Sequence, residues 1–141
     1  MKRGLVILAF LAIAGCSRPG QAPRATAEAF LDAHYVRIDL PAAQALASGL
    51  ARDKIEKEIA LTKDNRIDGE TMQPRVNYAL QRADEAELAA LYAYELTIRA
   101  PGVEPFYKVV TVTVRHADGA WSVTNYSEGD AREAPQATRP D

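Results

Sequence analysis

The spacing of apolar residues changes halfway along the chain, from a helical period to a strand period. In residues 26–40 apolar side chains recur every three or four positions, which is typical of an amphipathic helix with one face against a core. Thr26 is the expected N-cap of this helix, because its side chain can accept a hydrogen bond from the first turn. The face predicted to be inward comprises Ala27, Phe30, Leu31, His34, Tyr35 and Ile38.

Two more helices are expected before the period changes. Pro41 can open a helix at its first position and Gly49 can close it, which leaves 42–48 as about two turns. Residues 50–62 then form a third helix, and the alternating charges of 52–58 predict a solvated face on it. The apolar positions of the third helix repeat every four residues at Ala51, Ile55 and Ile59.

From Arg75 onward apolar and polar residues alternate, which is the pattern of strands with one buried face. Turn residues separate the runs at 82–87, at Pro101-Gly102 and at Asp118-Gly119, where both positions of a two-residue hairpin turn tolerate positive φ. The sequence therefore predicts an α+β domain in which N-terminal helices pack on a curved antiparallel sheet of about four strands. The expected inward positions are Val76, Tyr78, Leu80, Leu88, Ala90, Tyr92, Tyr94, Leu96, Ile98, Val110, Val112, Val114, Trp121 and Val123.

The first fifteen residues differ in composition from the rest. Lys2 and Arg3 precede an uncharged run, 4–15, that ends in small residues, and this is the layout of an export signal. The run is shorter than the roughly 20 apolar residues that a membrane-spanning helix needs. We therefore expect residues 1–15 to be a cleaved signal peptide, directly followed by the single cysteine of the chain, Cys16.

The junction Ile13-Ala14-Gly15-Cys16 closely resembles the lipobox of bacterial lipoproteins. The resemblance implies cleavage before Cys16 and a diacylglycerol on its thiol, so that lipid on Cys16 links the protein to the membrane. The family prefers Leu where this chain has Ile13. Ser17, in a position where Asp would favour the inner membrane, implies the periplasmic face of the outer membrane. The alternatives are an ordinary secretory signal that happens to end at a cysteine, or an uncleaved anchor.

Segments rich in proline, glycine and charge flank the predicted domain. We expect 16–24 to be the lipidated cysteine and a flexible tether, 25–128 to be the α+β domain, and 129–141 to be a disordered tail. Loss of Lys2 and Arg3 takes the formal charge from −2 to −4. A nucleic-acid partner is therefore not expected, because phosphates select clustered Lys and Arg.

The opening helix and the closing strand also carry a family resemblance. The segment Phe30-Leu31-Asp32-Ala33 and the strand Gly119-Ala120-Trp121-Ser122-Val123-Thr124-Asn125-Tyr126 resemble the nuclear transport factor two-like (cystatin-like) α+β superfamily, over residues 25–128. Small bacterial lipoproteins belong to this superfamily. The resemblance implies a curved sheet around a helix, often enclosing a conical pocket, and it covers isomerase-like and cyclase-like enzymes, ligand binders and scaffold modules. Fold alone does not choose among these roles.

An enzyme of the isomerase or cyclase kind needs an inward base and a donor for the developing oxyanion. Asp32 and Asp39 lie opposite the apolar face of the first predicted helix, so they fail as bases. His34 is the candidate base, with Tyr78 or Tyr94 as the donor, although a core histidine with a structural hydrogen bond is the interpretation we favour. The residues that would line a pocket are His34, Tyr35, Tyr78, Tyr92, Tyr94 and Asn125; we favour plain packing for the tyrosines.

Other chemistries lack their residues in this sequence. The two histidines, His34 and His116, lie 82 positions apart and Cys16 is the only cysteine, so neither a metal site nor a cofactor is predicted. His116 borders a hairpin turn, where we expect it to be exposed. We therefore favour a non-catalytic module that binds a small apolar ligand or an envelope protein, with a small isomerase-like or cyclase-like enzyme using His34 as the alternative.

Overall fold

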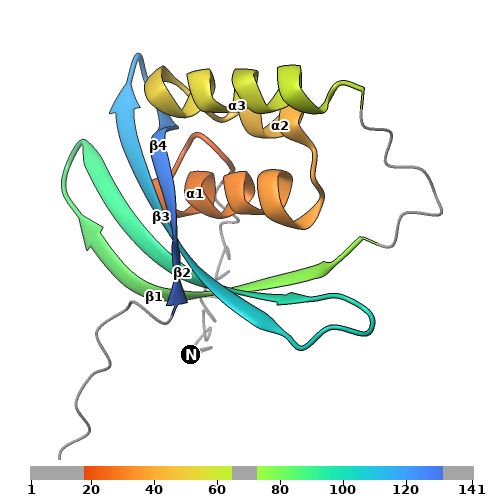
Figure 1. Cartoon of the computed structure of the whole chain (residues 1–141). Helices are drawn as coiled ribbons and strands as arrows, with labels where there is room; N and C mark the ends of the chain where they lie inside the picture. Colours follow the sequence, from red (N-terminus) through yellow and green to blue (C-terminus); the bar gives the residue numbers. More distant parts are fainter. Residues whose placement is uncertain (1–17, 65–72, 132–141) are drawn as a thin grey trace, which may run out of the picture.

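The computed structural model describes residues 18–64 and 73–131 of the 141-residue chain. The strands form one antiparallel meander in the order β1-β2-β3-β4, and Figure 1 shows this sheet curving around the helices. The α+β class and the packing of helices on a four-stranded antiparallel sheet are confirmed. The elements are α1 (Pro23–Leu31), the π-helical turn η1 (Asp32–Val36), α2 (Leu40–Ala45), α3 (Gly49–Thr62), β1 (Arg75–Glu85), β2 (Ala89–Arg99), β3 (Phe106–Ala117) and β4 (Ala120–Asp130).

The hydrophobic core lies between the helices and the concave face of the sheet. α1 packs against β2, β3 and β4, while α3 packs against β4. Burial of each large apolar side chain contributes about 1.5–3 kcal/mol, so this layer is the main source of stability. The large buried residues are Phe30, Leu31, Ile55, Tyr92, Tyr94, Leu96, Val110, Val112, Val114, Val123 and Tyr126.

The first helix begins earlier than predicted. Pro23 lies in its first turn and Ala22 occupies the N-cap position, where the fixed φ of proline suits the helix start. Thr26, predicted as the N-cap, lies one turn inside α1 and is fully buried. Its hydroxyl donates to the Ala22 carbonyl oxygen at 2.7 Å and accepts from the Gly20 amide at 2.8 Å, which ties the preceding segment to the helix.

Residues 18–22 pack on the domain, although the sequence placed them in a flexible tether. The Trp121 amide donates to the Gly20 carbonyl oxygen at 2.9 Å, so this segment covers part of the free edge of β4. Gly20 has φ of +85°, a conformation that glycine adopts without steric cost. At the other end β4 continues to Asp130, past the predicted domain boundary at Glu128. The predicted signal peptide and Cys16 lie outside the described residues, as do residues 132–141 of the predicted tail.

The predicted helix over residues 26–40 is divided in the structure. After α1 the backbone widens into η1, in which the Arg37 amide donates to the Asp32 carbonyl oxygen at 2.9 Å, five residues back. Ile38 then takes φ of +54° and is 37% exposed, so it is not on the buried face as predicted. Asp39 ends this break by accepting a hydrogen bond from the Ala42 amide, as the N-cap of α2.

Gly49 begins a helix instead of ending one. α2 ends at Ala45, and Gly49 takes φ of +53° as the first residue of α3. The Ser48 amide donates to the Val123 carbonyl oxygen at 2.8 Å, so the connection between the two helices also covers the edge of β4. The predicted third helix is confirmed with its start one residue earlier, and Ala51 and Ile55 are buried as expected.

A register shift in the pairing with β2 changes the phase of β1. A register shift between Leu80 and Arg82 lets β1 continue to Glu85, so the turn predicted at 82–87 lies at 86–88 and Leu88 is exposed. The predicted hairpin turn has positive φ at both Asp118 and Gly119, +53° and +78°.

Within residues 18–64 and 73–131 no helix is long and apolar enough to cross a membrane.

Candidate functional site

His34 lies on η1 and faces the core, as its place on the predicted apolar face required. Its side chain is almost completely buried, and its Nε2 atom lies 2.8 Å from Oε2 of Glu58 on α3. Phe30 stacks on the imidazole with ring centroids 5.5 Å apart, and Tyr35 and Tyr126 pack at its edges. Nδ1 is buried and makes no hydrogen bond within the described part of the chain. Nε2 is therefore occupied by its hydrogen bond to Glu58, and Nδ1 is shielded from solvent.

Glu58 connects three elements through its two carboxylate oxygens. Oε2 binds His34 from η1, and Oε1 accepts a hydrogen bond of 2.5 Å from the Tyr126 hydroxyl of β4. Burial and this hydrogen bond raise the pKa of the Tyr126 hydroxyl. The sequence placed Glu58 on a solvated helix face, but its side chain is only 38% exposed and both of its oxygens bind buried residues. Sequence reasoning thus missed the acid that holds the histidine.

Lys54 supports the same region from one turn earlier on α3. Its Nζ donates to Oδ1 of Asn125 at 2.9 Å and to the Tyr126 carbonyl oxygen at 2.7 Å, and it lies 5.1 Å from the centroid of the Tyr126 ring. Lys54 and Glu58 are four residues apart and so lie on one helix face. The spacing alone does not reveal this inward side, because the exposed pair of Arg52 and Glu56 in the same run is also four residues apart.

Asn125 does not take the inward position that strict alternation predicted. Thr113 pairs with Asn125 while Val114 pairs with Val123, so Thr124 is an extra residue in β4. The bulge reverses the phase of the strand, and the buried side chain after Val123 is Tyr126. Asn125 instead reaches Lys54 at the boundary between sheet and helix.

Tyr35 joins a second acid from the end of β4. Its hydroxyl donates to Oε1 of Glu128 at 2.7 Å, and Lys108 of β3 donates to Oε2 of the same carboxylate at 3.0 Å. Burial, and then the bond to Glu128, raise the pKa of Tyr35 well above its usual range. Burial opposes ionisation of Glu128, but the hydrogen bonds from Tyr35 and Lys108 outweigh it and hold the pKa of Glu128 below its usual value.

The strand tyrosines are also held by carboxylates. Tyr78 donates to Oδ1 of Asp32 at 3.1 Å, which contradicts the prediction that Asp32 points away from the domain. Burial and this charge raise the pKa of Tyr78 to about 12. Tyr92 donates to Oε1 of Glu85 at 2.5 Å, at the end of β1. Tyr94 is fully buried with its ring perpendicular to that of Tyr78, and its hydroxyl has no hydrogen bond within the described ranges.

The predicted candidates therefore form two clusters of packed rings, in which every ring except that of Tyr94 is hydrogen-bonded to a carboxylate. One surrounds His34 and includes Tyr35; the other contains Tyr78, Tyr92 and Tyr94. His116 belongs to neither cluster. It was predicted to be exposed, but it is partly buried and packs against Trp121 at a centroid distance of 5.2 Å. Within residues 18–64 and 73–131 no three His, Cys, Asp or Glu side chains are grouped as metal ligands would be.

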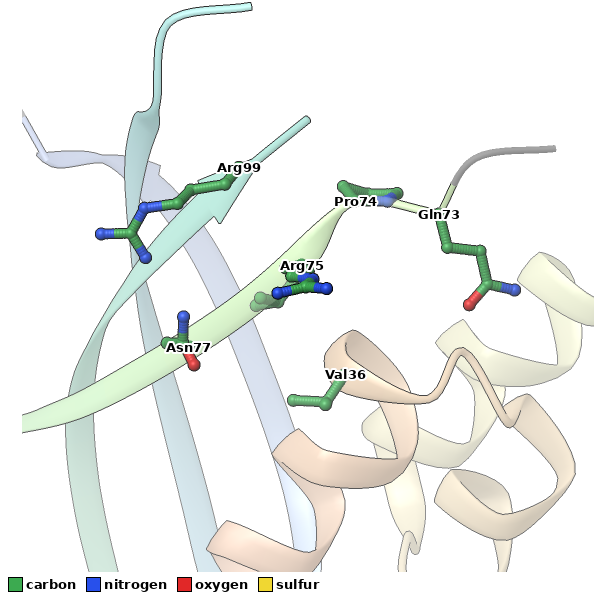
Figure 2. A pocket seen from close by; sticks show the side chains of 7 residues that line it. Val36, Gln73, Pro74, Arg75, Asn77 and Arg99 are labelled. Atoms are coloured by element: carbon green, nitrogen blue, oxygen red, sulfur yellow. The ribbon is translucent and has the colours of Figure 1, made fainter. Parts of the chain in front are cut away.

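An open depression lies apart from both clusters, at the start of β1. It has a volume of about 510 Å³, and its rim is formed by residues at the paired ends of β1 and β2 (Figure 2). None of the predicted pocket-lining residues borders it. Arg75 and Arg99 contribute the charge, Gln73 and Asn77 contribute amides, and Val36, Pro74 and Val76 contribute apolar surface.

No protein-family model matches this chain, and no curated protein matches it. Among solved structures the chain is similar to the intermembrane space region of the chloroplast protein ARC6. The sequence identity is 14% and the TM-score is 0.36, over 77% of this chain and 88% of that chain. This similarity is too distant to carry an argument about function.

Proposed function

We propose that this chain is a lipoprotein of the bacterial cell envelope whose small domain is a non-catalytic binding module. The junction Ile13-Ala14-Gly15-Cys16 supports an anchor made by lipid on Cys16, and Ser17 supports the periplasmic face of the outer membrane. The partner is then a small ligand or another protein of the envelope.

The observation that carries the non-catalytic role is the environment of His34. A general base must come within hydrogen-bonding reach of the proton that it abstracts. Nε2 of His34 is bound to Glu58, and Nδ1 is buried beneath the helices and the sheet. This arrangement weighs against the alternative, an isomerase-like or cyclase-like enzyme with His34 as base and Tyr78 or Tyr94 as donor.

The nuclear transport factor two-like fold belongs to the same proposal. The curvature of the sheet around α1 in Figure 1 supports it, as do the helices that precede the strands. In this chain the space between α1 and the sheet is filled by side chains such as Phe30, Tyr94 and Leu96, each fully buried. Binding then takes place on the outside of the domain.

Replacement of the lipidated residue tests the anchor. We expect wild-type full chain expressed in a Gram-negative bacterium to be processed, to incorporate labelled palmitate and to fractionate with the outer membrane. Cys16→Ala removes the thiol that accepts lipid, so it should accumulate as an unlabelled precursor. The readouts are the intact mass and the label in each membrane fraction.

Ser17→Ala is the matched control, because it changes the neighbouring residue and leaves the thiol in place. We expect it to be processed and labelled as the wild type is. Recovery of Cys16→Ala at the processed mass and still anchored in the membrane would overturn the proposal.

A further inference from the structure

Two arginines lie at the rim of the open depression, one on each of two paired strands. Arg75 and Arg99 are directly paired residues of β1 and β2, at the end of the sheet next to the π-helical turn. Directly paired residues of an antiparallel ladder project from the same face, with Cβ atoms about 4.5–5.5 Å apart. Both side chains are exposed and border the same depression, so both guanidinium groups are open to a ligand there.

Neither arginine is neutralised by an acid of the described residues. The ion pairs found there join Arg24 to Glu28, His34 to Glu58, Arg52 to Glu56, Arg82 to Asp84 and Lys108 to Glu128. Like charges placed opposite each other on a sheet are destabilising. An arrangement that opposes folding in this way is consistent with a binding role, because an anion between the two groups removes the repulsion.

The surroundings of the arginines add further donors and an apolar floor. In the view of Figure 2 the Asn77 side chain lies on β1 below the two guanidinium groups, and Gln73 lies on the side of Arg75 away from Arg99. Side-chain amides donate hydrogen bonds as well as accept them, so they can complete the shell of an oxyanion. Val36 and Val76 supply apolar surface beside these polar groups. The volume of about 510 Å³ falls in the range of small-molecule sites.

We propose that this depression binds a phosphate group through Arg75 and Arg99. Arginine matches phosphate with paired, charge-assisted hydrogen bonds. A phosphate monoester carries about −1.5 to −2 charges at neutral pH, which balances two guanidinium groups, whereas a carboxylate would balance only one. The inference rests on the proposed binding role and adds to it a site and a ligand class. The phosphate belongs either to a soluble ester or to a lipid headgroup.

Titration with inorganic phosphate tests the site directly. Full chain purified in a non-ionic detergent is titrated by calorimetry at constant ionic strength, with chloride as the balancing anion. We expect saturable binding of one phosphate per chain. Arg75→Gln and Arg99→Gln should each weaken this binding about tenfold or more, because each removes charge-assisted hydrogen bonds to the phosphate.

Arg115→Gln provides the control for charge. Arg115 is exposed on β3 and pairs with Ala89 and Ser122, away from the depression, so its loss changes the net charge equally. We expect its phosphate affinity to stay within about twofold of the wild type, less than 0.5 kcal/mol. Thermal unfolding provides the second readout: phosphate should raise the Tm of wild type and Arg115→Gln more than that of the other two variants. Equal phosphate affinity in all four proteins, or no binding to wild type, would overturn the site.

Two phosphate esters distinguish the sources of the ligand. Glycerol 3-phosphate represents a soluble ester, and monomeric dihexanoyl phosphatidic acid adds short acyl chains to the same group. Tighter binding of the lipid indicates a headgroup whose chains lie on Val36 and Val76, while equal binding indicates a soluble ester. Failure of both to bind overturns the phosphate site. Anchoring through Cys16 is scored separately by processing and fractionation, so the two proposals fail in different experiments.

Discussion

At the scale of single residues, Glu58 holds the inner polar groups together. It accepts from His34 and from Tyr126, two side chains that the sequence separates by 92 positions. The alternating charges of residues 52–58 predicted only a solvated helix face, since such a run does not reveal which carboxylate contacts the core. His34 itself was predicted correctly as an inward residue, because helical spacing fixes the face on which it lies.

Glu58→Ala removes the acceptor of two interior donors. An unpaired buried polar group costs about 1–3 kcal/mol, so we expect the free energy of unfolding to fall by an amount in that range or above it. Urea unfolding followed by circular dichroism measures the change.

Glu56→Ala is the matched control on the same helix. Glu56 is 54% exposed and binds the side chains of Gln44 and Arg52 at the surface, so its loss should cost less than about 0.5 kcal/mol. Equal destabilisation by the two substitutions would show that Glu58 does not hold the interior together.

The tyrosines give the domain a pH dependence on the alkaline side. Burial and then neighbouring carboxylates raise the pKa of Tyr78 to about 12, and the pKa values of Tyr35, Tyr92, Tyr94 and Tyr126 are raised as well. A raised pKa in the folded state contributes stability below the unfolded pKa of about 10, and this stability is lost as the pH rises through the folded pKa.

We therefore expect the free energy of unfolding to decrease steadily above pH 10. Absorbance at 295 nm, which reports tyrosinate, should rise at higher pH in the folded chain than in the same chain in 8 M urea. Tyr78→Phe should remove part of this difference. Coincident titration curves in the folded and unfolded chain would contradict the packing described for these rings.

At the scale of elements, periodic patterns in the sequence predicted helices and strands, but they did not predict irregularities of a single residue. The helical and alternating periods predicted the third helix, the strand faces and the Asp118-Gly119 turn. The π-helical turn after Leu31, the bulge at Thr124 and the register shift before Arg82 each add or displace one residue. A bulge reverses the phase of the rest of its strand, and a π-helical turn rotates the residues that follow it in the helix. No local composition marks either irregularity, so Asn125 and Tyr126 exchanged their expected places.

The packing of residues 18–22 on the domain was also not predicted, because the proline and glycine of this segment are typical of a tether. Its attachment depends on Thr26, whose buried hydroxyl accepts from the Gly20 amide while it donates to the Ala22 carbonyl oxygen. Thr26→Val keeps the shape of the side chain but removes both hydrogen bonds. We expect a loss of about 1–3 kcal/mol in urea unfolding. The Trp121 amide, which donates to Gly20, should exchange with deuterium faster.

Thr62→Val controls for the loss of a hydroxyl on a helix. The Thr62 hydroxyl also donates to the carbonyl four residues back, that of Glu58, but it is exposed. We expect the substitution to change stability by less than about 0.5 kcal/mol. Unchanged exchange at Trp121 in Thr26→Val would mean that residues 18–22 do not depend on this hydroxyl.

At the scale of the whole molecule, the sequence predicted the fold class and the order of elements better than the site. The fold class follows from the spacing of apolar residues over many positions, whereas a site depends on contacts between residues far apart in the chain. Glu58, Glu128 and Asp32 come from three different elements to bind the predicted His34 and tyrosines. Arg75 and Arg99 are paired only through the register of β1 and β2, which the sequence does not specify to the residue.

We propose that His34 is a structural residue that no substrate can reach. Diethyl pyrocarbonate acylates accessible imidazole nitrogens, and His116 serves as an internal control because it is only partly buried near the end of β3. Peptide mapping by mass spectrometry after treatment of the folded chain should find His116 modified and His34 protected, with both modified in urea. Modification of His34 in the folded chain as fast as that of His116 would contradict the account and favour an accessible base.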